Sequence, residues 1–257
     1  MRKNLTELAN NPDLIPGIYN YCDRWCERCP LTSRCLVYAT ESEPTDNNDT
    51  QNDDSRNAAF WQTLSETLAE VRQLIPEWAK QTLDLDTSLQ QNSVRRRSRH
   101  VDNHPLTKAG KQYANTASEW FRELDHNSEI TLTSAERPTE VDRQNPQPFE
   151  DAREVIQWYQ YQIAVKTMRA LSGRKEEIED PEIADFPKDS DGSAKVALIG
   201  IDRSIAAWRL MQLSLSDRAE SIVPLILQLD SLRTKLEESF PQARDFMRPG
   251  FDQIAAA

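Results

Sequence analysis

Apolar residues recur every three or four positions along most of the chain after residue 57, and this spacing predicts amphipathic helices. The predicted helices cover residues 58–80, 105–125, 149–172, 192–214 and 217–240. The stretch KVALIGI at 195–201 also alternates as a strand would, but the apolar pattern around it continues well beyond strand length, which favours a helix. We therefore expect an all-α protein built as an antiparallel bundle of four to five helices.

Glycine and proline indicate where these helices end. Gly173 follows the third pattern and is expected to be its C′ stop, because glycine adopts the left-handed conformation that closes many helices. Pro224 lies inside the fifth pattern and is expected to start or kink that helix, since proline lacks a backbone N–H. Pro241 is expected to end it.

A polar stretch divides the chain. Residues 41–57 read ESEPTDNNDTQNDDSRN, carry no large apolar side chain and are strongly acidic, which predicts a flexible linker. Residues 1–40 are then a cysteine-rich metal-binding segment, and residues 58–257 are the helical bundle with long polar loops. About 40 residues make a marginal domain by themselves, so we expect the aromatic residues within 18–25 to dock this segment on the bundle.

The charge of the chain argues against several kinds of partner. The 257 residues include 31 Lys and Arg against 42 Asp and Glu, a net charge of −11, which disfavours nucleic acid and anionic membranes. No apolar run is long enough for a membrane-spanning helix. The basic start MRK is not followed by an apolar stretch, so no signal peptide is expected, and the predicted location is the cytoplasm, where thiols stay reduced.

The strongest chemical signal is a run of cysteines near the N-terminus. Cys22, Cys26, Cys29 and Cys35 are all the cysteines of the chain, and their spacing is C-x3-C-x2-C-x5-C. A helix over 17–29 would place the first three on one face, Pro30 would end it, and Cys35 would close the site. Four thiolates are the ligand set of an iron–sulfur cluster or of a structural Zn²⁺ site. Disulfides and ordinary buried thiols are the two weaker interpretations.

A partial resemblance and the spacing of the ligands favour an iron–sulfur cluster over zinc. The run Cys26-x2-Cys29-Pro30-x4-Cys35 resembles the C-terminal three-cysteine motif of iron–sulfur nucleases of the RecB-like and CRISPR-associated exonuclease type. Their fourth cysteine lies far upstream, whereas Cys22 is adjacent here, and no nuclease core is visible, so the resemblance implies a cluster and no nuclease activity. Cys22-x3-Cys26-x2-Cys29 is similar to the radical SAM motif, but those enzymes need a β/α barrel. Zinc sites also commonly use two separated cysteine pairs.

Three further groups are weaker candidates. A basic patch at 95–111 could contact nucleic acid or an anionic partner, although a solvated loop is the simpler interpretation. His100 and His104 have the i, i+4 spacing of a shared metal site on a helix. Paired carboxylates at helical spacing could hold two metals, but the Glu-x-x-His pairs of such bundles are missing. They are Glu119 with Glu123, and Glu150 with Glu154.

These observations predict a cytoplasmic, metal-binding helical protein. Its centre, held by Cys22, Cys26, Cys29 and Cys35, is expected to be an iron–sulfur cluster of the 4Fe–4S kind that serves redox sensing, electron transfer or stability. The main alternative is a Zn²⁺-stabilised helical module that docks an unknown protein partner. A second alternative is an enzyme with a pocket in the bundle, although no catalytic residues can be named.

Overall fold

A computed structural model describes residues 8, 11–41, 100–131, 148–179 and 188–252. The chain divides into two compact units. The first contains Met1–Tyr19 and Cys26–Arg96, and the second contains Asn20–Trp25 and Arg97–Ala257. The predicted helix at 58–80 and residues 42–57 of the predicted linker lie outside the described residues.

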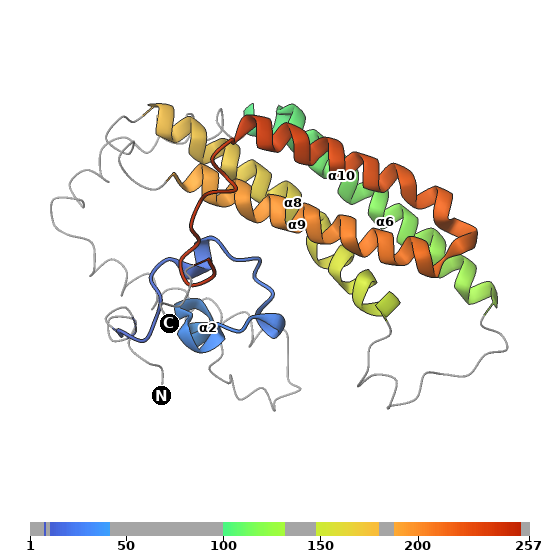
Figure 1. Ribbon diagram of the computed structural model, residues 1–257, viewed down its shortest axis with the longest axis horizontal. Helices are drawn as coiled ribbons and strands as arrows, with labels where there is room; N and C mark the ends of the chain where they lie inside the picture. The colour runs from blue at the N-terminus through green and yellow to red at the C-terminus, as the bar shows by residue number, and fades with distance from the viewer. Residues whose placement is uncertain (1–7, 9–10, 42–99, 132–147, 180–187, 253–257) are drawn as a thin grey trace, which may run out of the picture. The chain divides into compact units, whose positions relative to one another are not determined.

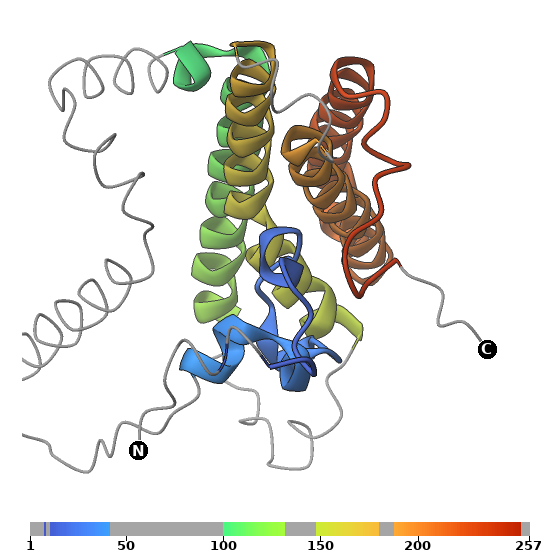
Figure 2. The same cartoon turned by 90° about the vertical axis from the view of Figure 1, so that its left-hand side faces the viewer.

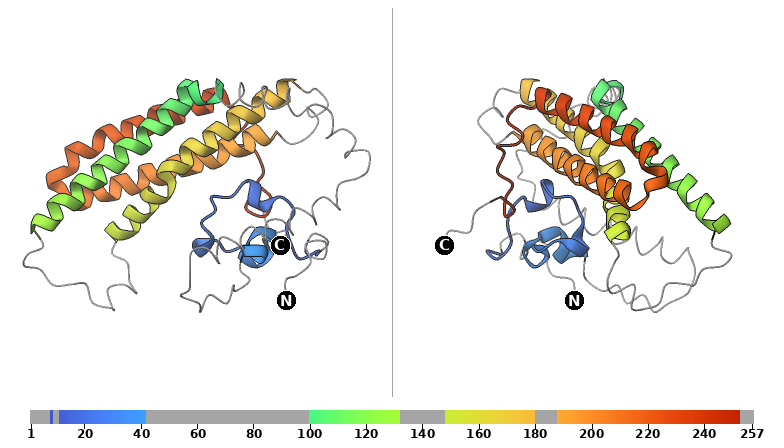
Figure 3. Two further views of the ribbon diagram at one scale, coloured as in Figure 1. Left: turned by 180° about the vertical axis from the view of Figure 1, so that it is seen from behind. Right: turned by 45° about the vertical axis from the view of Figure 1, so that its right-hand side comes forward.

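Four long helices make up most of the second unit: α6 (Pro105–Thr131), α8 (Pro148–Glu179), α9 (Asp189–Ser214) and α10 (Ala219–Ser239). Successive helices run in opposite directions, as Figures 1 and 3 show. Each helix contacts the next, and α10 returns to contact α6, so the four close into an up-and-down bundle (Figure 2). The predicted helical bundle is confirmed, and the described residues contain no strand.

The burial of side chains follows the apolar spacing of the sequence. In α10 the buried residues Ile222, Leu225, Leu229, Leu232 and Leu236 alternate at spacings of three and four, which is the seam of a helix that packs on one side. Helix α9 is buried over a much wider surface and begins with small residues, Ser190 to Ala194. The stretch 195–201 is therefore the interior of a central helix, and not a strand. No helix of the described residues is long and apolar enough to cross a membrane.

The predicted helix end at Gly173 is wrong, and so is a helix start at Pro224, while a kink at Pro224 stays a prediction. Helix α8 continues through Gly173 to Glu179, so this glycine is not a stop. A Cβ atom at Gly173 would lie 3.3 Å from the backbone nitrogen of Ser190, so glycine serves there to let α8 approach the start of α9. Pro224 lies within α10, which begins five residues earlier at Ala219. Packing of the apolar seam therefore outweighs the hydrogen bond that this proline cannot make.

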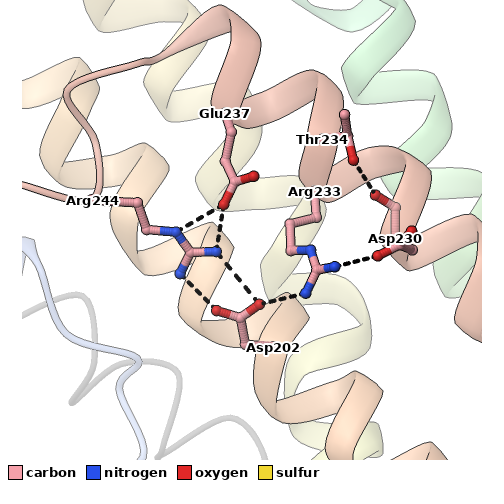
Figure 4. A network of polar contacts seen from close by, with 6 residues as sticks. All are labelled: Asp202, Asp230, Arg233, Thr234, Glu237 and Arg244. Atoms are coloured by element: carbon pink, nitrogen blue, oxygen red, sulfur yellow. Dashed lines mark hydrogen bonds and ion pairs between the residues drawn. The ribbon is translucent and has the colours of Figure 1, made fainter.

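A charged network joins α9, α10 and the residues that follow α10. Arg244 donates to Asp202 of α9 at 2.6 Å and to Glu237 of α10 at 2.7 Å (Figure 4). Arg233 of α10 also reaches Asp202, at 3.5 Å, and bonds Asp230. These side chains are about one-third to one-half exposed, so each pair contributes little by itself, about 0–1 kcal/mol. Together they hold the chain after Phe240 against the bundle.

The last described residues are held to α9 by a second ionic contact. Lys195 lies 2.9 Å from Asp252 and also donates to the backbone oxygen of Phe246 at 2.6 Å. Arg248 reaches the same carboxylate through its guanidinium at 2.9 Å and through its backbone N–H at 3.0 Å. Burial by itself would raise the pKa of Asp252, but these donors outweigh it and hold the pKa well below the usual range of an aspartate.

The low pKa of Asp252 predicts a loss of stability in acid. A carboxyl group whose pKa is lower in the folded than in the unfolded state stabilises the fold above the unfolded value, about 3.9, and loses that contribution as the pH falls. We expect the wild-type protein to be more stable than Asp252→Asn by about 1–2 kcal/mol near pH 7. The difference should shrink between about pH 4 and pH 2. Urea unfolding of both proteins across this range measures it, and a difference that does not change with pH would contradict the assignment.

Candidate metal centre

The cysteine segment does not form the predicted helix over 17–29. It contains two short 3₁₀ turns, η1 (Ile18–Asn20) and η2 (Cys26–Arg28), separated by non-helical residues. Gly17 and Arg24 have positive φ angles of 73° and 58°, which a continuous right-handed helix excludes. Cys22, Cys26 and Cys29 therefore do not share a helical face, and this part of the prediction is wrong.

Residues Asn20–Trp25, called the Cys22 segment below, pack on the helices of the second unit. Asp23 is its main contact. The Asp23 carboxylate accepts hydrogen bonds from the Tyr159 hydroxyl and from Arg203 at 2.8 Å. Its backbone oxygen accepts from the Trp158 indole at 3.0 Å and from Gln162. One residue of the Cys22 segment thus bonds three side chains of α8 and one of α9.

Aromatic side chains on both sides of Cys22 complete this docking. Trp25 is only 5% exposed, and its ring stacks on Trp158 with centroids 4.9 Å apart. Tyr21 packs against Phe246 with centroids 4.7 Å apart. A Cβ atom at Gly192 would lie 2.4 Å from the Tyr21 ring, so glycine at this position gives Tyr21 its place beside α9. Tyr21 and Trp25 therefore pack within the second unit, and the docking of residues 1–40 as a whole on the bundle stays a prediction.

Cys22 is half-buried and has several cationic neighbours. Burial raises the pKa of its thiol, and the Arg24 backbone N–H, the Lys166 ammonium and the Arg24 guanidinium act in the opposite direction. Lys166 donates to the Asn20 backbone oxygen at 3.3 Å, and Arg169 donates to the same oxygen at 3.4 Å. Arg24 has a positive φ, and its backbone N–H is the one that hydrogen-bonds the Cys22 sulfur. Burial outweighs these groups, so the pKa of the Cys22 thiol lies above its usual value and the neutral thiol is favoured.

The other three cysteines belong to the first unit. Cys26 begins η2, and the Cys29 N–H donates to the Cys26 backbone oxygen at 3.2 Å. The Cys29 sulfur accepts a hydrogen bond from the Leu31 backbone N–H at 3.4 Å. Cys35 lies between a third 3₁₀ turn, η3 (Thr32–Arg34), and helix α2 (Leu36–Glu41). The backbone oxygen of Arg34 accepts from Ile15 at 3.0 Å, which ties this stretch to the preceding chain.

Thiols are the ligand type that a metal–thiolate centre uses. All four cysteines are free thiols of intermediate burial. The sulfurs of Cys22 and Cys29 each receive the backbone N–H two residues further on, and such N–H···S bonds stabilise metal-bound thiolates. Within the part of the chain that the structure describes, however, no three His, Cys, Asp or Glu side chains are gathered as a metal would require.

The weaker candidates are mostly found on exposed helix surfaces. The carboxylates of Glu119, Glu123, Glu150 and Glu154 are exposed, so they do not line the bundle core and a two-metal site there is not supported. His104 accepts the Leu106 N–H on its Nδ1 atom at 3.2 Å and so helps begin α6. Burial lowers its pKa. In the predicted basic patch, Lys111 pairs with Asp102 at 3.0 Å, while Arg95, Arg96, Arg97 and Arg99 lie outside the described residues.

A groove of about 460 Å³ lies between α6 and α10. Apolar atoms dominate its lining, and Lys235 is its charged residue. It does not bring together the carboxylates or histidines that an enzyme pocket in the bundle would need. The enzyme hypothesis therefore gains no support from this groove.

No motif in the sequence marks the residues that surround Cys22. These residues are polar and have no recognisable spacing in the sequence. They are Asp23, Lys166, Arg169 and Arg203. One signal was available for Lys166. It follows Tyr159 and Ile163 and precedes Ala170 at spacings of four, three and four, so it belongs to the apolar stripe of its helix. A lysine in such a stripe predicts a buried cation.

Comparison of the chain with family models, with curated proteins and with solved structures finds no match.

Proposed function

We propose that this chain is a metal-binding helical protein whose centre is held by Cys22, Cys26, Cys29 and Cys35, and that the centre is an iron–sulfur cluster. The observation that carries the proposal is the presence of four free thiols within one short run of the sequence. Backbone N–H donors at the sulfurs of Cys22 and Cys29 support it, because hydrogen bonds to sulfur tune such clusters. The cluster would serve redox sensing, electron transfer or stability.

A Cys₄ zinc site is the alternative for the same four residues. Zinc accepts the same thiolates but does not change oxidation state, so its role would be structural. The bundle would then be a module for binding a protein partner, with the zinc holding the cysteine segment in shape. The anchoring of the Cys22 segment by Asp23 and Trp25 is compatible with either metal.

Metal analysis of the full chain tests the proposal. The protein is purified without oxygen, and iron, acid-labile sulfide and zinc are quantified together with the visible absorption spectrum. We expect iron and sulfide in equal amounts, and loss of both in the serine variants of each cysteine, because each removes one thiolate ligand. Ser33→Ala, between Cys29 and Cys35, is the matched control and should keep the cluster.

The other results of this experiment are equally informative. One zinc per chain without sulfide would replace the cluster with the zinc alternative. A protein that carries neither metal and takes up neither on reconstitution would overturn the metal-binding function. If all four serine variants kept their full metal content, the assignment of the four cysteines as ligands would be wrong.

A further inference from the structure

Residues 244–252, called the strap below, follow α10 and return to the start of α9. They belong to the red segment that leaves the end of α10 in Figure 1. Phe240 and Ala243, which precede the strap, are buried in the bundle core, whereas every residue of the strap itself is half-buried or exposed. A segment that buries few apolar side chains is among the least stable parts of a protein and opens before the rest. The strap is therefore suited to open while the bundle stays folded.

Ionic contacts fix the strap at its two ends. At the first end, the Arg244 guanidinium lies 2.6 Å from Asp202 of α9 (Figure 4). At the other end, the Lys195 ammonium of α9 lies 2.9 Å from Asp252, and it also donates to the backbone oxygen of Phe246 at 2.6 Å. Ion pairs that solvent reaches stabilise little by themselves and are weakened further by salt. The strap is thus held by contacts that are each weak, and Lys195 makes two of them.

The middle of the strap packs on the residue next to Cys22. The centroid of the Phe246 ring lies 4.7 Å from that of the Tyr21 ring. Both rings also pack against Gly192 of α9, because a Cβ atom there would lie 2.4 Å from the Tyr21 ring and 2.8 Å from the Phe246 ring. Since Gly192 has no side chain, Phe246 supplies the ring that holds Tyr21 against α9. The strap, Tyr21 and the start of α9 therefore form one packed cluster.

We propose that the strap is a latch that controls the access of reagents to Cys22, through the packing of Phe246 on Tyr21. With the strap docked, Phe246 keeps Tyr21 on α9, and the half-buried Cys22 thiol next to it is protected. When the ion pairs of Lys195 and Arg244 break, Phe246 leaves and Tyr21 loses its aromatic partner. Cys22 then becomes accessible to oxidants, metal ions and alkylating reagents.

The opening of the strap should be local. Asp23 bonds side chains of α8 and α9, and Trp25 stacks on Trp158, and the strap takes part in neither contact. Only the first half of the Cys22 segment is therefore released. The inference goes beyond the proposed metal-binding function and does not depend on it, because it concerns how a reagent reaches the thiol.

The rate of cysteine alkylation in the metal-free full chain tests the latch. Trypsin places each of the four cysteines on a different peptide, because Arg24, Arg28 and Arg34 separate them. The rate at which iodoacetamide labels Cys22 can therefore be measured by mass spectrometry independently of the other three. Lys195→Met removes both contacts of Lys195 with the strap. We expect it to raise the labelling rate of Cys22 about 5- to 30-fold, since the strap is then open for a larger fraction of the time.

Three further variants show whether the effect belongs to the strap. Arg244→Gln weakens its more exposed end and should raise the labelling rate of Cys22 up to about fivefold. Lys195→Arg keeps the charge and should stay within about threefold of wild type. Lys235→Met removes an exposed charge from the groove between α6 and α10, and this matched control should leave the rate unchanged. Added salt should speed the labelling of Cys22 in the wild-type protein more than in Lys195→Met.

The coupling between the strap and Tyr21 can also be measured in the opposite direction. Tyr21→Ala removes the ring on which Phe246 packs, so amide hydrogen exchange within 244–252 should become faster while exchange within α6 stays unchanged. The near-ultraviolet circular dichroism of the stacked Trp25 and Trp158 should stay unchanged in Lys195→Met, because the opening is local. Unchanged hydrogen exchange of the strap in Tyr21→Ala would contradict the coupling.

Three results of the labelling experiment would overturn the inference. They are an unchanged rate at Cys22 in Lys195→Met, an equal rise in the Lys235→Met control, and a rise at Cys35 as large as that at Cys22. The last result would show that Lys195→Met loosens the whole chain and does not release the strap alone. Failure of the proposed metal-binding function is seen separately, because the labelling experiment uses protein without metal.

Discussion

Replacing Trp208 with alanine is expected to lower the free energy of unfolding by about 3–5 kcal/mol. Trp208 of α9 is fully buried and contacts three residues of α6. Its ring meets Trp120 edge-on at 5.0 Å and stacks on Phe121 at 5.4 Å. Its indole N–H donates to the Tyr113 hydroxyl at 3.0 Å. The alanine variant would therefore leave a large cavity and an unpaired buried hydroxyl.

Two other variants separate packing from general effects of mutation. Trp208→Phe keeps most of the ring volume but loses the hydrogen bond to Tyr113, so it should cost about 1–3 kcal/mol. Leu213→Ala, on the same helix but 82% exposed, should change stability by less than about 0.5 kcal/mol. Urea unfolding followed by far-ultraviolet circular dichroism measures all three. A loss below 2 kcal/mol in Trp208→Ala would show that the bundle core is not packed around this ring.

The helices of the bundle could be predicted because their apolar residues repeat over many turns. The patterns at 105–125 and 217–240 correspond closely to α6 and α10, since burial of one face outweighs local exceptions such as Pro224. The helix end predicted at Gly173 was wrong because a glycine is typical both of helix ends and of close contacts between helices. The choice between them depends on Ser190, seventeen residues further along the chain.

The cysteine segment could not be predicted in the same way because local chemistry competes with periodicity. The spacing of Cys22, Cys26 and Cys29 is that of a helical face, but Asp23 accepts the Trp25 backbone N–H at 3.2 Å in a turn. Asparagine and aspartate favour such turns over helix. The partners that then hold Asp23, Tyr159 and Arg203, are more than 130 residues away in the sequence. Their role follows from the packing of α8 and α9, which no local pattern encodes.

The contacts of Asp23 also affect how much conformational freedom Cys22 would lose on binding a metal. Cys22 is the ligand candidate that belongs to the second unit, and it lies between Tyr21 and Asp23, which are both held by bundle residues. A ligand fixed in this way loses little conformational freedom when it binds metal. Cys29 and Cys35 depend instead on the short turns η2 and η3. The affinity of the proposed centre should therefore depend strongly on the anchoring of the Cys22 segment.

Asp23→Ala is expected to release this anchor and to lower the free energy of unfolding by about 2–4 kcal/mol. It removes the acceptor for Tyr159 and Arg203 and the turn that positions Trp25. Arg203 is about half exposed, so its direct pairing with Asp23 should account for only about 1 kcal/mol in a double-mutant cycle with Arg203→Met. The near-ultraviolet circular dichroism of the stacked Trp25 and Trp158 should fall, and metal should dissociate faster. The exposed carboxylate variant Asp245→Ala should change none of these quantities. An Asp23→Ala protein with wild-type stability and an unchanged tryptophan signal would show that the aromatic contacts hold the Cys22 segment without Asp23.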